Sequence, residues 1–365
     1  MPEAAFVIPH PYVDALACYR EPMVALAARG WNIDLYTVMN RDNPPPSFLG
    51  PRIRLVPVSL TKLKTAQMVA RLVLRRPKYD WVFSVPGWGL HYAGIAARLA
   101  RIPAVCISDE LHARSECRTE DERRWKEREI RAHRACAFTI ALSSERADFI
   151  RDENGLGDVH PIFVVPNSSP GPARRLASDF FQKKFGFGAD TFVLLHAGSW
   201  WWRKDFSRIE SVTAGWDKGL ALVFHGRMKD AADAAPGPPN IYYSRQPLPY
   251  AELDRAVSSA HVGLALYDNS SVNHRLVGAA GGKIPLYMKN ALPVIATRQP
   301  SFEWMEKERC GVLIDDLSEI GAAAGRIRAQ YAEYSENARR AYDARFNFTK
   351  NFEPVIQRLE GAKRS

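Results

Sequence analysis

Residues 282–297 read GKIPLYMKNALPVIAT. The stretch predicts a loop, a short helix and then a buried strand, because glycines precede the helical run and apolar residues end it. A glycine-rich turn from Gly278 to Gly282 that opens a helix presents unpaired N–H groups, and Lys283 adds a full positive charge. Two interpretations follow from the residues, an anion site or an ordinary helix–strand unit with a solvated lysine.

The rest of the chain shows the same alternation of strand and helix. Short apolar runs alternate with amphipathic, Arg- and Ala-rich segments, which is typical of parallel strands joined by crossover helices. A cluster of turn formers at 167–172, NSSPGP, predicts a domain boundary. We therefore expect an α/β protein with domains at 1–168 and 174–345. A C-terminal helix is expected within 346–365, and one arrangement would pack it across both domains. The expected strands are 4–8, 32–38, 53–58, 81–85, 104–108, 138–142 and 162–165, then 192–197, 221–225, 240–243, 262–266, 293–296 and 311–314.

Composition narrows the class of protein. The chain has 365 residues, is 46% hydrophobic and carries a formal charge of +10, which suggests an anionic partner without choosing among nucleic acid, a membrane surface and a phosphorylated substrate. Its five cysteines form no Cys-x-x-Cys pair, which favours a reduced, cytoplasmic location over a disulfide framework or a zinc cluster. No apolar run reaches the roughly 18 residues that span a bilayer, so any membrane contact is expected to be peripheral.

The run at 282–297 resembles the Lys-x-x-Glu-Tyr-Met…Gly-x-Pro-Val-Ile-Ala segment of glycosyltransferase family 4, the glycosyl transferases group 1. The resemblance implies the GT-B fold, in which two Rossmann-like parallel-sheet domains face each other across a cleft. It implies a hexosyltransferase-like enzyme that moves a sugar from a nucleoside-diphosphate sugar to an acceptor hydroxyl, retaining and metal-independent, in glycan, glycolipid or glycosylated-metabolite synthesis. No cofactor and no metal are expected, and the sequence contains no Asp-x-Asp motif.

A second stretch, LLHAGSWWWRKD at 194–205, resembles the first strand of the family's donor domain, where an Arg and a Lys hold the donor pyrophosphate. Lys204 occupies the lysine position, Ser199 stands where the arginine is usual, and Arg203 is a neighbouring source of charge. Glycosyl transfer leaves a nucleoside diphosphate, whose growing negative charge needs preorganised cationic donors. A protein-contact patch of three tryptophans with two solvated cations is the other interpretation.

A third stretch, YYSRQPLPYAEL at 242–253, resembles the family segment that lies beside the nucleotide base. An ordinary β-α-β unit is the alternative for each of its side chains. The resemblance as a whole implies these donor-binding residues: Gly198, Ser199, Arg203, Lys204, Arg245, Gln246, Leu248, Gly282, Lys283, Leu286 and Tyr287.

In the N-terminal half, ISDELH at 107–112 resembles the family segment near the reacting sugar. His112 is placed to orient a donor hydroxyl or the acceptor, and Asp109 or Glu110 to take a proton from it. His10 and Tyr12, in the loop after the first strand, are acceptor-side candidates. A structural or solvated role is the alternative for each of these side chains.

Two departures from the family bear on activity. Gly278 and Leu286 stand where the family carries two glutamates, and loss of the second carboxylate removes an acceptor for ribose hydroxyls. The PHPY sequence at 9–12 replaces the glycine-rich turn that often follows the first strand. Two alternatives therefore stay open, a non-catalytic GT-B-like interaction protein with a degenerate donor site and a nucleotide-sugar epimerase, whereas no nucleic-acid recognition motif is present.

The segment from 43 to 79 carries eight basic residues and no acidic one. Apolar residues interleave with the cations, which predicts a basic amphipathic helix at 62–75 within a candidate contact segment at 62–78. Such a helix could rest on anionic lipid at the inner membrane face or receive a lipid-linked or anionic acceptor. A solvated outer face is the other interpretation.

Overall fold

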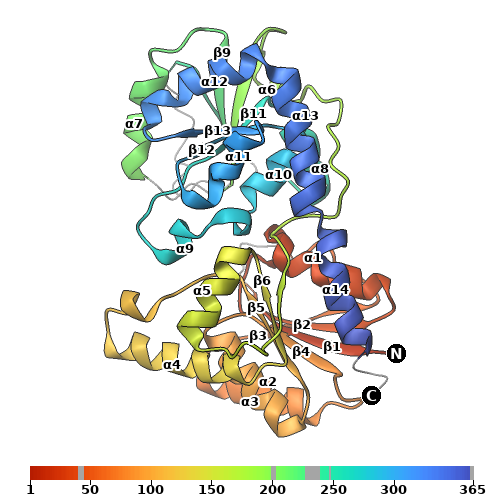
Figure 1. Cartoon of the computed structure of the whole chain (residues 1–365). Helices are drawn as coiled ribbons and strands as arrows, with labels where there is room; N and C mark the ends of the chain where they lie inside the picture. The colour runs from red at the N-terminus through yellow and green to blue at the C-terminus, as the bar shows by residue number, and fades with distance from the viewer. Residues whose placement is uncertain (40–44, 199–202, 227–238, 246–247, 362–365) are drawn as a thin grey trace. The chain divides into compact units, whose positions relative to one another are not determined.

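The computed structural model describes residues 1–39, 45–198, 203–226, 239–245 and 248–361, with the backbone alone for 203–207 and 250–251. The chain divides into two compact units (Figure 1). Unit 1 comprises Met1–Ser168, Ser270–Ala280 and Phe348–Ser365, and unit 2 comprises Ser169–Asn269 and Gly281–Asn347.

Unit 1 is built on a seven-stranded parallel sheet with the order β3-β2-β1-β4-β5-β6-β7. The order reverses between β1 and β4, and every residue of these two strands is buried. Burial on both faces explains why the strands read as continuous apolar runs. The strands are β1 (Glu3–Val7), β2 (Asn32–Val38), β3 (Ile53–Val58), β4 (Trp81–Ser84), β5 (Ala104–Ser108), β6 (Phe138–Ala141) and β7 (Ile162–Val164).

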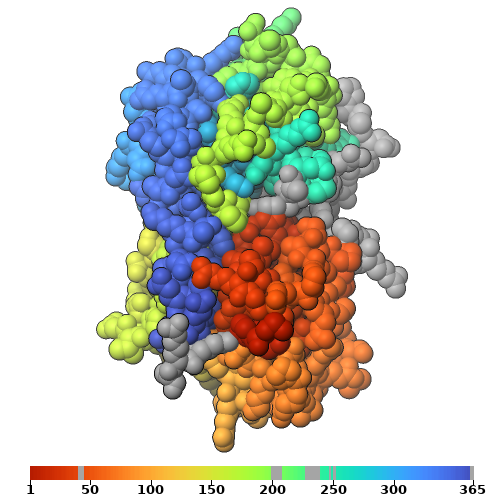
Figure 2. Space-filling model, turned by 90° about the vertical axis from the view of Figure 1, so that its right-hand side faces the viewer, coloured from red at the N-terminus to blue at the C-terminus, as the bar shows by residue number. Residues whose placement is uncertain are grey.

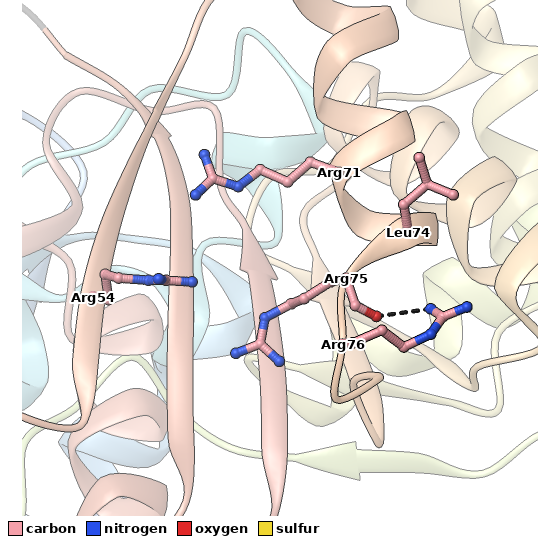
Figure 3. A pocket seen from close by; sticks show the side chains of 5 residues that line it. All are labelled: Arg54, Arg71, Leu74, Arg75 and Arg76. Atoms are coloured by element: carbon pink, nitrogen blue, oxygen red, sulfur yellow. Dashed lines mark hydrogen bonds between the residues drawn. The ribbon is translucent and has the colours of Figure 1, made fainter.

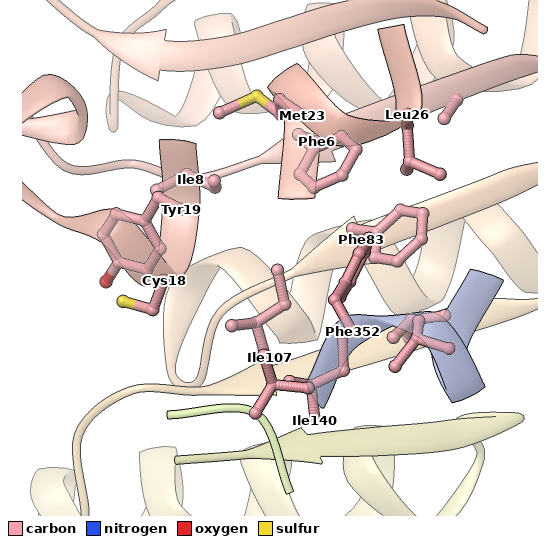
Figure 4. Packing of buried hydrophobic residues seen from close by; sticks show 14 of the residues in the cluster. Phe6, Ile8, Cys18, Tyr19, Met23, Leu26, Phe83, Ile107, Ile140 and Phe352 are labelled. Atoms are coloured by element: carbon pink, nitrogen blue, oxygen red, sulfur yellow. The ribbon is translucent and has the colours of Figure 1, made fainter. Parts of the chain in front are cut away.

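The core of unit 1 joins strands to the first and last helices. Phe6 and Phe83 stack with ring centroids 4.4 Å apart, and Met23, Leu26 and Phe352 belong to the same buried cluster (Figure 4). In the space-filling view the blue C-terminal segment lies against the red start of the chain (Figure 2). The helices of unit 1 are α1 (Ala17–Ala28), α2 (Lys62–Leu74), α3 (Trp88–Ala100), α4 (Glu120–Arg134), α5 (Ser144–Asn154), α9 (Val272–Arg275) and α14 (Phe348–Gly361).

Unit 2 is built on a six-stranded parallel sheet with the order β10-β9-β8-β11-β12-β13, which reverses between β8 and β11. The strands are β8 (Phe192–Ala197), β9 (Leu220–His225), β10 (Ile241–Ser244), β11 (Val262–Ala265), β12 (Val294–Thr297) and β13 (Gly311–Ile314). The helices are α6 (Phe180–Phe185), α7 (Arg203–Thr213), α8 (Tyr250–Ser258), α10 (Lys283–Lys289), α11 (Glu303–Lys307), α12 (Ile320–Ala329) and α13 (Tyr331–Ala341).

Two chain segments belong to unit 1 although they follow the turn cluster at 167–172. The guanidinium of Arg146 donates to the carbonyl oxygens of Asn273 at 2.9 Å and Leu276 at 2.8 Å, which ties the 270–280 segment to unit 1. Helix α14 buries Phe352 and Val355 in the unit 1 core. The division is therefore not the pair of continuous ranges expected from the sequence, because these tertiary contacts have no local sequence signal. None of the helices in the described part of the chain is long and apolar enough to span a membrane.

Candidate functional site

Both units place their candidate residues at the carboxyl ends of the strands. In open parallel sheets, ligands bind outside these ends where the strand order reverses. In unit 2 the reversal lies between β8 and β11, followed in the chain by Gly198 and Tyr267. In unit 1 it lies between β1 and β4, and His10 follows β1.

Two glycines end neighbouring strands of unit 2 in backbone conformations that side chains rarely adopt. Gly198 has φ 121° and Gly226 has φ 141°. A Cβ on Gly226 would lie 2.5 Å from the carbonyl oxygen of Gly198, so only glycine fits there. The Gly198 N–H donates to His225 at 2.9 Å and the Gly226 N–H donates to Ser244 at 3.1 Å. The two segments that follow β8 and β9 therefore turn close to each other just past the end of the sheet.

Lys283 is the first residue of α10, and its ammonium group lies against the Gly198 turn. A Cβ on Gly198 would lie 3.2 Å from the Lys283 Cε and 3.6 Å from its Nζ. The Nζ is 5.5 Å from the centroid of the Tyr267 ring. Among the residues that the structure describes, no acceptor or carboxylate pairs with this ammonium. In the described part of the chain, the corner formed by Gly198, Tyr267 and Lys283 thus holds a cation without a counter-ion.

Burial lowers the pKa of Lys283 to about 8. Removing an ammonium from water without supplying a negative partner disfavours the charged form. The Lys283 charge also helps to lower the pKa of His196, although burial is the larger cause. An anion bound at this corner would restore the lost solvation of the ammonium.

Tyr287 connects the two strand ends next to this corner. Its hydroxyl accepts from the Ala197 N–H at 2.8 Å and donates to the Leu264 carbonyl at 3.2 Å, which ties the ends of β8 and β11 together. The side chain is fully buried, and a Cβ on Gly263 would lie 2.1 Å from its ring. Burial raises the pKa of the Tyr287 phenol, which stays protonated. The structure therefore places this predicted donor-binding residue beneath the turn.

The other predicted donor residues fall into three groups. Gly282 is the N-cap of α10, and Leu286 is partly buried one turn after Lys283. Arg245 and Leu248 are partly exposed beyond β10, with the Arg245 guanidinium 5.4 Å from the Tyr243 ring. Helix α7 begins at Arg203, so the backbone of two predicted pyrophosphate residues is placed but their side chains are not described. Of the predicted donor residues, Ser199 and Gln246 lie outside the described residues, and only the backbone is described for Arg203 and Lys204.

Tyr267, Gly226 and Thr297 were not predicted from the sequence. The Thr297 hydroxyl accepts from the Tyr267 N–H at 2.9 Å and donates to its carbonyl at 2.8 Å, which joins the ends of β11 and β12. One local signal was available for Gly226. The LVFHG run at 222–226 repeats the pattern of LLHAG at 194–198, an apolar strand with a histidine close before a glycine.

In unit 1 the structure gathers three predicted residues around Tyr19. The Tyr19 hydroxyl donates to the Asp109 carboxylate. The His10 ring lies 6.0 Å from the Tyr19 ring and 5.6 Å from the Tyr12 ring, and its Nδ1 accepts from the Tyr12 N–H at 3.1 Å. Burial lowers the pKa of His10. A histidine, two phenols and a carboxylate therefore meet at the carboxyl edge of the sheet, and Tyr19 is the member that sequence reasoning missed.

The Asp109 carboxyl group has a strongly altered titration. Burial raises its pKa to about 6, the hydrogen bond from Tyr19 lowers it, and the Glu110 charge raises it. A carboxylate with this pKa is largely ionised at neutral pH and close enough to the solution pH to exchange a proton. The group suits a general base.

Glu110 and His112 lie at the surface, in contrast to Asp109. The His112 Nε2 lies 3.4 Å from the Cys117 Sγ. The Leu111 N–H between them donates to the Asn273 side chain at 3.0 Å, which fixes the loop. The structure thus separates the expected group of three into one half-buried acid and two exposed side chains.

No protein-family model matches the chain, and no curated protein matches its sequence. Solved structures match over the whole chain. HepE from Anabaena in complex with UDP-glucose has a TM-score of 0.73 at 13% identity, covering 99% of this chain and 100% of that one. Sucrose-phosphate synthase from Thermosynechococcus elongatus has a TM-score of 0.70 at 16% identity, covering 100% and 98%. The chain has the GT-B fold.

This result confirms the fold class predicted from the sequence, two Rossmann-like parallel-sheet domains. WaaG, described as a glycosyltransferase involved in lipopolysaccharide biosynthesis, has a TM-score of 0.67 at 15% identity, covering 99% of this chain and 100% of that one. The GT-B fold accounts for both strand-order reversals, since each Rossmann-like sheet reverses once.

Proposed function

We propose that this GT-B protein is a nucleotide-sugar glycosyltransferase whose donor diphosphate binds at the Gly198–Tyr267–Lys283 corner of unit 2. The observation that carries the proposal is the Lys283 ammonium, which has no counter-ion in the described residues and lies at the switch point of a parallel sheet. HepE, crystallised with UDP and with UDP-glucose, supports a uridine nucleotide as the first ligand to test.

The chemistry of the corner fits a diphosphate leaving group. Transfer of the sugar leaves negative charge on the β-phosphate, and a positioned ammonium in a partly dry site stabilises that charge. A charge-assisted hydrogen bond contributes about 1.5–3 kcal/mol. Gly198 and Gly226 add no side chain of their own at the sheet ends, which lets the Gly226 backbone pack against Gly198 and the Lys283 side chain lie beside Gly198. Arg203 and Lys204, at the start of α7, complete the proposed cationic set.

The proton of the acceptor hydroxyl passes to Asp109 in this proposal. Its carboxylate is the half-buried acid of the predicted group, and its pKa of about 6 leaves it ionised at neutral pH. Tyr19 holds one of its oxygens by donating a hydrogen bond, and His10 and Tyr12 line the acceptor side. His112 and Glu110 serve as surface contacts to the acceptor.

The finer assignment follows the sequence resemblance. We infer a family 4-type enzyme that retains anomeric configuration without a metal, located in the cytoplasm and acting in polysaccharide or glycolipid synthesis. Its acceptor is lipid-linked or anionic and is met at the inner membrane face through residues 62–78. The basic composition of that segment, with eight cations and no acid between 43 and 79, supports this part.

A second function is favoured by one residue. Leu286 places an aliphatic side chain on α10 where a ribose-binding carboxylate would stand in the family, so a GT-B interaction protein with a degenerate donor site is the competing proposal. Such a protein would neither bind a nucleoside diphosphate nor consume a nucleotide sugar. An epimerase would consume the sugar nucleotide without an acceptor.

The test is a thermal-shift screen of the full chain with UDP, GDP, ADP and dTDP at fixed salt. A ligand at about 100 times its dissociation constant stabilises the native state by about 2.7 kcal/mol, so binding raises the melting temperature measurably. We expect a shift with one nucleotide, and then slow release of that diphosphate from the matching nucleotide sugar. No shift with any of the four would contradict a donor site and favour the interaction protein.

A further inference from the structure

One stretch of chain leaves the unit 2 corner at Tyr267 and returns to it at Lys283. Residues 270–280 of this stretch, named here the bridging segment, belong to unit 1 and contain α9. Only residues 268–269 separate the bridging segment from Tyr267, and only residues 281–282 separate it from Lys283. The Lys283 Nζ lies 5.5 Å from the centroid of the Tyr267 ring. Both ends of the bridging segment are therefore tied by short lengths of chain to the proposed donor site.

Arg146, on α5, joins the bridging segment to the backbone of Asp109. Arg146 is buried, with 2% of the residue exposed. Its guanidinium donates to the Leu276 carbonyl at 2.8 Å and to the carbonyl and side-chain oxygens of Asn273 at 2.9 and 2.7 Å. It also donates to the Asp109 carbonyl at 2.7 Å. Since a guanidinium presents its N–H groups in a fixed, planar fork, this one side chain holds the bridging segment and the proposed base together.

The loop that follows β5 makes two further hydrogen bonds to the bridging segment. The Asn273 Oδ1, which accepts from Arg146, also accepts from the Leu111 N–H at 3.0 Å. The Val272 N–H donates to the Glu116 carboxylate at 2.6 Å. One side-chain oxygen is thus shared between a buried cation and the backbone of the loop, so a displacement of Asn273 would disturb both contacts at once.

Asn167 holds the far end of the bridging segment beside Tyr19. Its side-chain nitrogen donates to the Ala280 carbonyl at 3.1 Å, and its side-chain oxygen accepts from the Cys18 N–H at 2.9 Å. Cys18 directly precedes Tyr19, whose hydroxyl donates to the Asp109 carboxylate. The bridging segment is therefore connected within unit 1 to both members of the Asp109–Tyr19 pair.

We propose that the bridging segment couples donor binding at the Lys283 corner to the placement of Asp109, with Arg146, Asn167 and Asn273 as positioning residues. The inference rests on the proposed donor site. A diphosphate that fixes the corner restricts the short lengths of chain on either side of the bridging segment, and the hydrogen bonds pass this order to the loop that carries Asp109. The base is then held in place when a donor is bound.

The test is hydrogen-exchange mass spectrometry of the full chain with and without saturating UDP, or with GDP, ADP or dTDP if one of those gives the thermal shift. The peptide 109–113 contains the Leu111 N–H. We expect the nucleotide to slow exchange of this peptide about fivefold, at the lower end of typical coupling between two sites. Asn273→Ala is expected to abolish the slowing. Arg146→Lys should abolish it as well, because an ammonium cannot present the fork.

Coupling between two sites is reciprocal, which gives a second measurement. If nucleotide binding stabilises the closed form of the loop by a given factor, the closed loop tightens nucleotide binding by the same factor. Calorimetry is therefore expected to show a dissociation constant about fivefold higher in Asn273→Ala than in the wild type. A purely structural role for Asn273 would speed exchange of 109–113 equally with and without nucleotide.

Matched controls come from hydrogen-bonded side chains of unit 1 that do not contact the bridging segment. Arg75 lies with Arg54 and Arg71 in a surface hollow at the end of α2 and donates to the Glu3 carboxylate at 2.8 Å (Figure 3). Asn32, at the start of β2, donates to the same carboxylate at 2.9 Å. Arg75→Lys and Asn32→Ala remove hydrogen bonds as the test variants do, and both are expected to keep the nucleotide-induced slowing.

Three outcomes would overturn the coupling. Nucleotide binding that leaves exchange of 109–113 unchanged in the wild type would do so and leave the donor site standing. Equal slowing in the wild type and in Asn273→Ala, or equal loss of slowing in the test and control variants, would likewise refute the coupling alone. Absence of binding with all four nucleotides would contradict the donor site itself, and the coupling with it.

Discussion

The two sheets carry opposite chemistry at the same place. In unit 2 the carboxyl edge presents the Lys283 ammonium, which has no counter-ion among the described residues, and burial lowers its pKa to about 8. In unit 1 the edge presents the Asp109 carboxyl, whose pKa burial raises to about 6. Burial drives both groups toward neutrality, but only Asp109 has an internal partner, Tyr19. This difference fits our proposal that unit 2 binds an anionic donor group and that Asp109 in unit 1 accepts a proton.

The largest expected effect concerns the proton-accepting side of this comparison. Asp109→Asn keeps the shape of the side chain and removes the base, so turnover of the nucleotide sugar is expected to fall by about 10²–10⁴-fold with donor affinity unchanged. Release of the nucleoside diphosphate measures turnover. Glu110→Gln, at the exposed neighbour, is the matched comparison and should retain most activity. A larger loss of turnover in Glu110→Gln than in Asp109→Asn would show that Glu110, and not Asp109, is the base.

The next effect concerns the packing of the Tyr287 ring against Gly263, next to the Gly198–Tyr267–Lys283 corner. A methyl group on Gly263 would overlap the Tyr287 ring, at 2.1 Å from one of its carbons, so Gly263→Ala is expected to destabilise the fold by about 3 kcal/mol. Gly325 lies on α12 with open space around it, and Gly325→Ala is expected to stabilise by about 0.5–1 kcal/mol. Urea unfolding measures both. Equal stability of the two variants would mean that Tyr287 does not brace β11.

The sign of the pH dependence distinguishes the two edges. The pKa of Lys283 lies near 8, so its charge is present below that pH and is lost above it. UDP affinity is therefore expected to fall by up to about tenfold between pH 7 and 9. Lys283→Arg keeps a cation that does not titrate in this range, and its profile should be flat. A wild-type profile as flat as that of the arginine variant would show that another group holds the diphosphate.

The smallest effect is a shift in the acid limb of the activity profile. Since the hydrogen bond from Tyr19 lowers the pKa of Asp109, Tyr19→Phe is expected to raise that pKa above about 6 and to move the limb to higher pH. At pH well above the limb, turnover should approach the wild-type value. A rate loss that is uniform across pH would instead indicate a purely structural role for Tyr19.

Part of this architecture could be predicted from the sequence and part could not. Most strands were predictable because they are buried and read as apolar runs, and the start of a helix at Lys283 was predictable from the glycine-rich turn before it. Tyr19 lies 90 residues from Asp109, and nothing near either residue signals their hydrogen bond. Tyr287 was expected on the ligand side, but the sequence of a seven-residue helix does not fix which side faces the sheet. Arg146, which binds the 270–280 segment to unit 1, was missed for the same tertiary reason.

The most direct test of the central claim is titration calorimetry of UDP against three proteins at pH 7. These are the wild type, Lys283→Met, and Lys307→Met, which removes an exposed lysine of α11 in the same unit. We expect Lys283→Met to weaken UDP binding by about 10–100-fold, which corresponds to one charge-assisted contact, and Lys307→Met to bind UDP as the wild type does. Equal affinities in all three proteins would contradict a donor diphosphate at the Lys283 corner.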